Sequence, residues 1–556
     1  MKDFRKEIKL LRFVWTMAKG QQLKIVIGFA VGIVLALIPA IVAFAVKDNI
    51  DNNNNSIAQL LNADELMKFT IIIASGVICS LIIKVLHGIA MPAIKRNVDM
   101  AYIRKISSMP YSYIADKTDS SAIMGVSIES DMIASLIPVI YNSFIKAPIT
   151  VAAFIVVLIV SSIKLTIIAV VLALMIAIGV LLCRNRIKDT TKECYDKIGG
   201  MHRLFNEMLT GYKVFVVSDS MNFMKKRLIR MSENICDLKQ KVTKVNATQS
   251  FVVEAVTVAI TITFIIVAKN NLTMSQTFSI TNLILFPTAI LYIRSEVLKI
   301  VYGYGQLSRT ESATKRVMNI ILKKDDIDKR EIAVDEKIES LTLKNITFSY
   351  VEGHPVLNDV TCEFKKNGVN CIVGRSGEGK TTLLNICMGL RLPDKGDVIY
   401  NKIDIHEGIN TWIYKKIALI EQEPFIFEGS ISDNIFLGRK EDSEKALQML
   451  RTLQLQHLAN TVDELHTTMI GGRYRKLSTG EKQRLAGVRA AIRDIDVIFL
   501  DEATSNIDTN NTKILIDFIN ELAKEKLIIS VSHDMSFISN STNVVVLENG
   551  KLRRIC

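Results

Sequence analysis

Residues 374–382 form a glycine-rich stretch whose residue types suit the binding of nucleotide phosphates. They read G-R-S-G-E-G-K-T-T. Glycines let backbone N–H groups approach phosphate oxygens, the lysine reaches the β and γ phosphates of ATP, and the hydroxyl after it ligates Mg²⁺. We therefore assign the phosphates to Lys380 and the metal to Thr381. The residues of this loop predicted to contact ATP are Gly374, Arg375, Ser376, Gly377, Glu378, Gly379, Lys380, Thr381 and Thr382.

Two adjacent carboxylates, Asp501 and Glu502, end a second apolar segment. Residues 497–500 before them read V-I-F-L, which predicts a buried strand. ATP hydrolysis needs an acidic ligand for the metal and a base that polarises the attacking water. Asp501 suits the first role and Glu502 the second. Such a strand end can be purely structural, but its presence beside a phosphate loop in the same chain favours the catalytic interpretation.

The segments around these residues predict an α/β domain that holds them in place. Residues 369–374 read as a buried strand that leads into the phosphate loop, and a helix is expected to follow through Leu390. Another apolar strand is predicted at residues 527–531, shortly before His533. Residues 337–556 are therefore predicted to form a C-terminal α/β P-loop ATPase domain.

The N-terminal part of the chain has the composition of a membrane protein. Of the 556 residues 49% are hydrophobic, and the mean hydropathy of +0.28 is high for a soluble protein. Residues 25–46 are uncharged, and about 20 helical residues are enough to cross the hydrocarbon. Over residues 23–322 we predict a membrane α-helical domain of six transmembrane helices with long cytoplasmic extensions. The five other apolar runs are residues 69–83, 147–163, 165–183, 255–268 and 271–293.

The net charge of +13 is explained by where the basic residues lie. A basic chain could bind nucleic acid, but Lys and Arg are concentrated at the N-terminus and in residues 95–146 and 184–244. Loops of this kind stay in the cytoplasm. We therefore predict a multi-pass protein of the cytoplasmic membrane whose N-terminus and ATPase domain are cytoplasmic. The lipid bilayer is an expected partner, and nucleic acid is not.

Two shorter segments complete the predicted domain organisation. Residues 1–22 place basic residues between apolar ones, which is typical of an amphipathic helix lying at the membrane surface. Residues 323–336 are polar and charged and are predicted to be a linker. The eight cysteines form no C-x-x-C pair, so we expect them to be reduced and to bind no metal.

Between the two ATP motifs, residues 477–484 read L-S-T-G-E-K-Q-R. Together with the predicted spans, this order of motifs resembles the exporter branch of the ATP-binding cassette (ABC) proteins, and the resemblance covers essentially the whole chain. In that family a signature of the form L-S-G-G-Q completes the ATP site of the partner subunit. Ser478 and Gly480 match it, whereas Thr479 and Glu481 depart from it.

The resemblance implies further site residues. Tyr350 stands where the family stacks an aromatic side chain on adenine, and Gln422 corresponds to the glutamine that senses Mg²⁺ and contacts the membrane half. Asp508 belongs to the D-loop, which crosses the dimer interface. His533 matches the switch histidine, which contacts the γ phosphate. The predicted catalytic residues are then Glu502, His533 and Gln422, and the predicted Mg²⁺ ligands are Thr381, Gln422 and Asp501.

The resemblance also implies a mechanism, in which two cassettes sandwich two ATP molecules. The chain is then half of a dimeric transporter that exports or flips a small peptide, a lipid or an amphipathic drug by alternating access. Docking helices are expected near residues 114–124 and 214–223. A homodimer is favoured because the other motifs are intact, while Thr479 leaves a heterodimer open. The alternative to a pump is an ATP-gated regulatory or channel-like protein, and the six spans exclude a soluble cassette protein such as a DNA-repair factor.

Several ionisable residues lie within or near the inner ends of the predicted spans. Charges at membrane depth usually face protein or water, so these side chains could line an inward cavity. The favoured alternative is that they lie in cytoplasmic helix extensions or reach the interface. The residues are Lys84, His87, Lys146, Glu254, Arg294 and Glu296.

Overall fold

The computed structural model divides the chain into two compact units. The helical unit comprises Met1–Met109 and Lys117–Lys323, and the α/β unit comprises Pro110–Asp116 and Lys324–Cys556. The residues that the structure describes are 2–52, 63–116, 126–161, 163, 166–167, 170–171, 190, 193–194, 196–274, 280–323, 336–405, 412–503, 509–533, 538–539 and 541–554.

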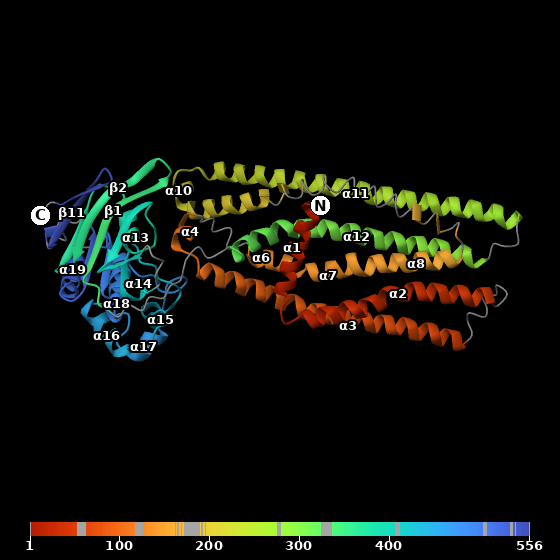
Figure 1. Ribbon diagram of the computed structural model, residues 1–556, viewed down its shortest axis with the longest axis horizontal. Coiled ribbons are helices and arrows are strands. Elements are labelled where there is room, and N and C mark those ends of the chain that lie inside the picture. The colour runs from red at the N-terminus through yellow and green to blue at the C-terminus, as the bar shows by residue number, and fades with distance from the viewer. Residues whose placement is uncertain are drawn as a thin grey trace. The chain divides into compact units, whose positions relative to one another are not determined.

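Long helices form the helical unit, and several of them run alongside one another (Figure 1). In α2, α3 and α8 the apolar residues are distributed around the whole helix, as expected for helices that face lipid as well as protein. The helices are α1 (Lys2–Met17), α2 (Gln22–Asn52), α3 (Ala63–Ser107), α6 (Val126–Ala134), α7 (Leu136–Ile140), the π-helical turn η2 (Tyr141–Lys146), α8 (Ala147–Ser161), α10 (Tyr212–Val217), α11 (Met221–Met274) and α12 (Ile280–Ile321).

Among the described residues, three helical stretches are long and apolar enough to cross a membrane. These are Gln22–Asn49, Leu66–Ser107 and Glu129–Ser161. The predicted run at residues 255–268 falls within α11. The run predicted at residues 271–293 is divided between the end of α11 and the start of α12, with residues 275–279 outside the described part, and residues 165–183 lie almost entirely outside it. A helical membrane domain ahead of an α/β domain is therefore observed, and the total of six spans stays a prediction.

The N-terminal helix α1 is amphipathic in the structure as well as in the sequence. Leu10, Phe13 and Val14 are buried in a cluster with residues of α3, α6, α7 and α12, while Leu11 and Trp15 on the other side remain exposed. Burial of each large apolar side chain contributes about 1.5–3 kcal/mol. The inner face of α1 is thus fixed by packing within the helical unit.

The α/β unit is built on a mixed six-stranded sheet in the order β12-β11-β3-β10-β9-β6 and an antiparallel four-stranded sheet in the order β2-β1-β4-β5. Strands β7 and β8 form a separate pair. The strands are β1 (Ser340–Val351), β2 (His354–Lys365), β3 (Val369–Val373), β4 (Lys395–Tyr400), β5 (Ile403–Asp404), β6 (Ile417–Ile420), β7 (Gly429–Ser430), β8 (Met469–Ile470), β9 (Val497–Asp501), β10 (Leu527–Val531), β11 (Asn543–Glu548) and β12 (Lys551–Arg554).

Helices of the α/β unit pack around the six-stranded sheet, which has a hydrophobic core on each face. Successive residues of β9 alternate between the two cores: Val497 and Phe499 belong to one, and Ile498 and Leu500 to the other. This is the period of two that a strand imposes. These helices are α13 (Lys380–Cys387), α14 (Ile413–Lys416), α15 (Ile431–Phe436), α16 (Ser443–Thr452), α17 (Val462–Thr467), α18 (Thr479–Ile492) and α19 (Thr509–Leu522). The unit also includes α4 (Tyr111–Asp116), whose described side chains belong to neither core.

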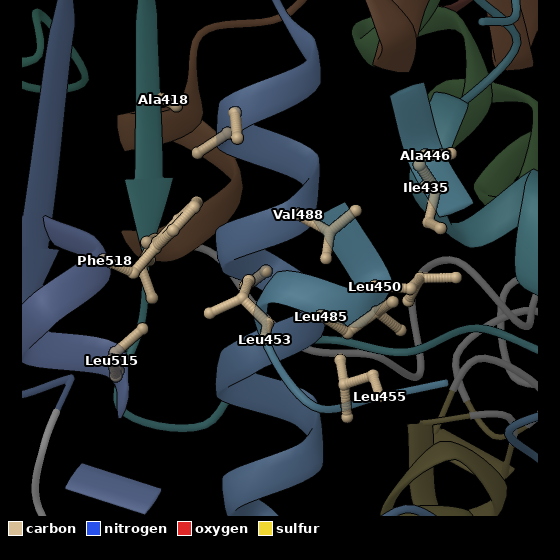
Figure 2. Packing of buried hydrophobic residues seen from close by; sticks show 14 of the residues in the cluster. Ala418, Ile435, Ala446, Leu450, Leu453, Leu455, Leu485, Val488, Leu515 and Phe518 are labelled. Carbon is tan, nitrogen blue, oxygen red and sulfur yellow. The ribbon is translucent and has the colours of Figure 1, made fainter. Parts of the chain in front are cut away.

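One core fixes helix α18, the helix that begins in the predicted signature. Figure 2 shows Leu485 and Val488 of α18 among side chains from α15, α16 and α19, and all of these belong to the same buried cluster. Gly487 lets α18 come close to its neighbours, since an added Cβ would lie 3.3 Å from Leu453. The packing of α18 in this core therefore fixes the position of its first residues, which belong to the predicted signature.

Two predicted boundaries differ from the structure. The helix after the phosphate loop ends at Cys387 and not at Leu390, because Gly389 has a φ of +69°. That left-handed backbone is typical of a helix C-terminus. Helices α4 and α10 begin before the predicted docking segments, at Tyr111 and Tyr212, while residues 117–125 and most of the predicted linker, residues 324–335, lie outside the described part.

Candidate ATP-binding and hydrolysis site

The predicted phosphate, metal and catalytic residues lie at one edge of the six-stranded sheet because parallel strands in register end together. Val531 of β10 pairs with Ile372 of β3 and with Asp501 of β9. The C-terminal ends of these strands lead into the phosphate loop, His533 and Glu502. Strand β6 lies beside β9 and is followed by Gln422. In open α/β sheets, ligands bind at this carboxyl edge.

The phosphate loop joins β3 to the N-terminus of α13 with a backbone that requires glycine. Gly377 and Gly379 have φ angles of +87° and +94°, and a Cβ on Gly374 would lie 2.5 Å from the carbonyl oxygen of Leu547. Arg375 and Ser376 are exposed. A helix N-terminus preceded by exposed backbone N–H groups is a suitable site for an anion.

Lys380 lies under this loop, and its side chain is almost completely buried. Its ammonium group donates hydrogen bonds of 2.9 Å to the carbonyl oxygens of both Gly374 and Arg375. The Glu378 carboxylate accepts a bond from the Asn549 N–H at 2.7 Å. The lysine thus stabilises the curved backbone of the loop, and its ammonium group lies inside the loop, where the loop is expected to bind phosphate oxygens.

Thr381 and Asp501 come together although they are far apart in sequence. The Thr381 hydroxyl lies 3.3 Å from a carboxylate oxygen of Asp501. Burial raises the pKa of Asp501, nearby Glu502 raises it further, and the Thr381 hydroxyl and Lys380 act in the opposite direction. A cation beside the carboxylate would favour its ionised form. The hydroxyl and carboxylate oxygens are the ligands that Mg²⁺ prefers, so these residues fit the predicted metal.

The remaining predicted metal ligand, Gln422, is placed differently. Its side chain is exposed and, among the described residues, makes no hydrogen bond with Thr381 or Asp501. The described part also contains no group of three His, Cys, Asp or Glu side chains suited to a metal. Mg²⁺ sites at nucleotides use few protein ligands together with phosphates and water.

Glu502 and His533 form the pair expected of a hydrolytic site. The His533 Nε2 atom lies 3.3 Å from a carboxylate oxygen of Glu502. Glu502 has a φ of +46°, which is unusual for a residue with a side chain. Its backbone N–H donates to Val531 at 2.9 Å, which holds this conformation. Strained backbone of this kind is concentrated at functional sites.

Tyr350 is the penultimate residue of strand β1, and 53% of its surface is exposed. The guanidinium carbon of Arg391 lies 4.9 Å from the centre of its ring, and Phe348 packs against it edge-on at 5.0 Å. The Tyr350 hydroxyl lies 3.1 Å from the Thr382 hydroxyl, in the helix that follows the phosphate loop. The ring is therefore held beside the loop and is accessible to a base.

We expect Tyr350→Ala to weaken ATP binding by about 1–3 kcal/mol, because base stacking on an aromatic ring contributes this much. Titration with a fluorescent adenine nucleotide measures the loss. Tyr474→Ala, which removes another partly exposed tyrosine of the α/β unit, is the matched control. Equal affinity of the Tyr350→Ala and control proteins would show that Tyr350 is only a strand residue.

The predicted signature begins helix α18 with a complete capping box. The Ser478 hydroxyl accepts a hydrogen bond from the Glu481 N–H at 3.2 Å, and the Glu481 carboxylate accepts one from the Ser478 N–H at 2.7 Å. Gly480 is buried in the first turn. The structure therefore places Ser478 and Gly480 together at the start of α18, while Asp508 lies outside the described residues.

Two residues near the site have contacts that the sequence pattern does not indicate. Gln483 of α18 is fully buried, and its amide donates to the Gln422 carbonyl at 2.7 Å. Burial raises the pKa of Glu421, and Asp501 raises it further. The burial of Gln483 and its bond to Gln422 cannot be recognised from L-S-T-G-E-K-Q-R alone, because the partner lies 61 residues away.

The ionisable residues of the helical unit are partly paired. Arg294 bonds to Glu254 at 2.7 Å, and Glu296 pairs with Lys299. His87 is buried against the Tyr141 ring, with 5.2 Å between ring centres. Lys84 is exposed and Lys146 is half-buried. Their role in lining an inward cavity stays a prediction.

Two family models match the chain. The model for the ABC transporter transmembrane region matches residues 23–297, and the ABC transporter model matches residues 357–505. A solved structure described as a bacterial Atm1-family ABC exporter with ATP bound superposes with a TM-score of 0.79, covering 97% of this chain and 94% of the other at 18% identity. At this identity the likeness concerns the fold.

The sequence relatives are distant. An ATP-dependent lipid A-core flippase of Pseudoalteromonas translucida is 24% identical over 82% of this chain and 79% of the flippase. The heterocyst differentiation ATP-binding protein HepA of Nostoc sp. is 25% identical over 72% of this chain and 66% of its own length. A lactococcin transport/processing ATP-binding protein LcnC-like of Lactococcus lactis is 28% identical over 51% of this chain and 39% of its own length.

Proposed function

Since this chain belongs to the ABC transporters and fuses their transmembrane region to their ATP-binding domain, we propose that it hydrolyses ATP to export or flip a substrate across the cytoplasmic membrane. One observation carries the proposal. Lys380, the Thr381–Asp501 pair and the Glu502–His533 pair all lie at the carboxyl edge of one sheet. Phosphate binding, metal binding and water activation are then available in a single site.

Each residue has a separate task in the proposed reaction. Lys380 and the loop N–H groups bind the β and γ phosphates, and Thr381 and Asp501 would hold Mg²⁺, which supplies positive charge to the phosphate oxygens when bound. Glu502 accepts a proton from water as the water oxygen attacks the γ phosphorus. The bond from that phosphorus to the bridging oxygen breaks, and ADP leaves with its electron pair. His533 orients Glu502 and contacts the γ phosphate.

The proposal includes a dimer, because the signature of each subunit completes the ATP site of the other. ATP binding closes the two cassettes, and α4 and α10 transmit the closure to the membrane helices. The N-terminus and the cassette are cytoplasmic in this arrangement. The intact Glu502–His533 pair favours a pump over an ATP-gated channel. A small peptide, a lipid or an amphipathic drug is the proposed substrate, and the named relatives include both a lipid flippase and a lactococcin transporter.

We expect the chain purified alone to be a dimer that hydrolyses ATP, with a rate that changes less than about threefold in Thr479→Gly. Thr479 is the first residue of α18 and has ordinary helical backbone, so its Cβ causes no strain there. ATPase assays and light scattering in lipid nanodiscs measure both properties. Ser443→Gly, at the first position of α16, controls for the helix-weakening effect of glycine. A lone chain that is inactive until a second gene product is added would favour the heterodimer.

A further inference from the structure

The signature helix α18 carries a carboxylate in its first turn, at Glu481, where the family pattern has a neutral glutamine. Only 15% of this side chain is exposed. If the start of α18 completes the partner's ATP site, as proposed above, an uncompensated negative charge there would oppose the binding of the ATP phosphates. Like charges that lie close together repel each other, and burial strengthens the repulsion because less water screens it. A signature with glutamate therefore needs a source of positive charge nearby.

Two side chains from outside the signature reach Glu481: the Arg475 guanidinium supplies positive charge, and the His457 imidazole supplies a close hydrogen bond. His457 places its Nε2 atom 2.6 Å from a carboxylate oxygen of Glu481, and the Arg475 guanidinium lies 3.4 Å from the same oxygen. Arg475 also approaches the His457 carbonyl oxygen at 3.5 Å, so the two basic residues are joined to each other. The second carboxylate oxygen accepts the Ser478 N–H at 2.7 Å.

These contacts hold Glu481 in its charged form. Burial alone would raise the pKa of Glu481, but the hydrogen bonds from His457 and Ser478 outweigh it and lower the pKa below its ordinary value. Both carboxylate oxygens are occupied by donors of this chain. The carboxylate therefore keeps its negative charge, and neighbouring donors of the same chain balance it. A neutral glutamine would make weaker hydrogen bonds and would not need a positively charged partner.

We infer that His457 and Arg475 are positioning residues that compensate Glu481, so that a signature containing a carboxylate can accept the partner's ATP. We call this group of three side chains the Glu481 clamp. The inference rests on the proposed composite ATP site. The clamp is separate from the placement of α18, because the helix is already anchored by Leu485 and Val488 in the core (Figure 2).

The clamp can be tested because both basic residues are nearly half exposed, with 44% of the His457 side chain and 45% of the Arg475 side chain accessible. We expect the full-length double variant His457→Ala/Arg475→Ala to need about tenfold more ATP for half-maximal closure of the cassettes, the effect of losing a charge-assisted hydrogen bond. Adding Glu481→Gln to this variant should restore the ATP requirement to within about twofold of the original. Rescue by removal of the carboxylate is a result that a merely structural role of the basic residues would not give.

Closure is measured by energy transfer between labelled cassettes in a Glu502→Gln background, so the readout does not depend on hydrolysis. The control is His466→Ala/Arg473→Ala, which breaks two ion pairs of the same unit, with Glu441 and Glu428. Unchanged closure in the clamp variant, or no rescue by Glu481→Gln, would overturn the inference. A chain that binds ATP but closes in no variant would contradict the proposed homodimer, and with it the site on which the clamp acts. If all variants close with normal ATP dependence, the role of the clamp is contradicted, whereas the proposed homodimer and its ATP site are not.

Discussion

Glu502→Gln is expected to reduce the ATPase rate by about 10²–10⁴-fold, the usual contribution of a positioned general base. The amide keeps the size of the side chain but cannot take a proton from water. Nucleotide binding should survive, since Lys380 and the loop are untouched. Phosphate release and ATP binding, measured on the same reconstituted sample, separate the two effects.

Glu521→Gln provides the control for Glu502→Gln, because it makes the same chemical change at an exposed glutamate of α19. Its rate should match that of the unaltered chain. ATP hydrolysis that persists in Glu502→Gln would remove Glu502 from the proposed mechanism and would reopen the assignment of the base. It would not affect the membrane assignment.

Lys380→Ala is expected to abolish ATP binding, because it removes the cation that faces the β and γ phosphates. Its ammonium group also ties together the carbonyl oxygens of Gly374 and Arg375. The variant therefore loses both the charge and part of the loop's shape. Equilibrium binding of a labelled ATP analogue measures the loss.

Lys380→Met distinguishes charge from shape, since it keeps most of the buried aliphatic stem. We expect it to bind ATP no better than Lys380→Ala, whereas its thermal unfolding should lie closer to that of the unaltered protein. Lys395→Ala, at an exposed lysine of β4, should change neither property. Normal nucleotide affinity in both Lys380 variants would contradict the assignment of the phosphate loop.

The strands that lead into the ATP motifs, and the motifs themselves, were predictable from sequence because their patterns are local. The apolar runs before the phosphate loop, Glu502 and His533 correspond to β3, β9 and β10, and β10 has the predicted bounds of residues 527–531. Their parallel register then brings the motifs to one edge. Continuous apolar runs of strand length are typical of buried parallel strands, and they are the signal that predicts β3, β9 and β10.

Contacts between distant segments could not be predicted in this way. The Gln483 amide, His457 and Arg475 are unremarkable in sequence, and their partners become evident only when α18 is packed in its core. The burial of Lys380 was equally hidden, because a phosphate-binding lysine is expected to be accessible. In the helical unit, the π-helical turn η2 interrupts a helix that composition alone would continue.

The bond from the Gln483 amide to the Gln422 carbonyl has a consequence for communication between subunits. In the proposed dimer, Gln422 belongs to the pocket where its own subunit binds ATP, whereas α18 belongs to the opposite pocket. A movement of the Gln422 segment caused by one nucleotide would be passed by this bond to the helix that contacts the other nucleotide. The two pockets would then sense each other's occupancy through the interior of each cassette, as well as across the surface where the cassettes meet.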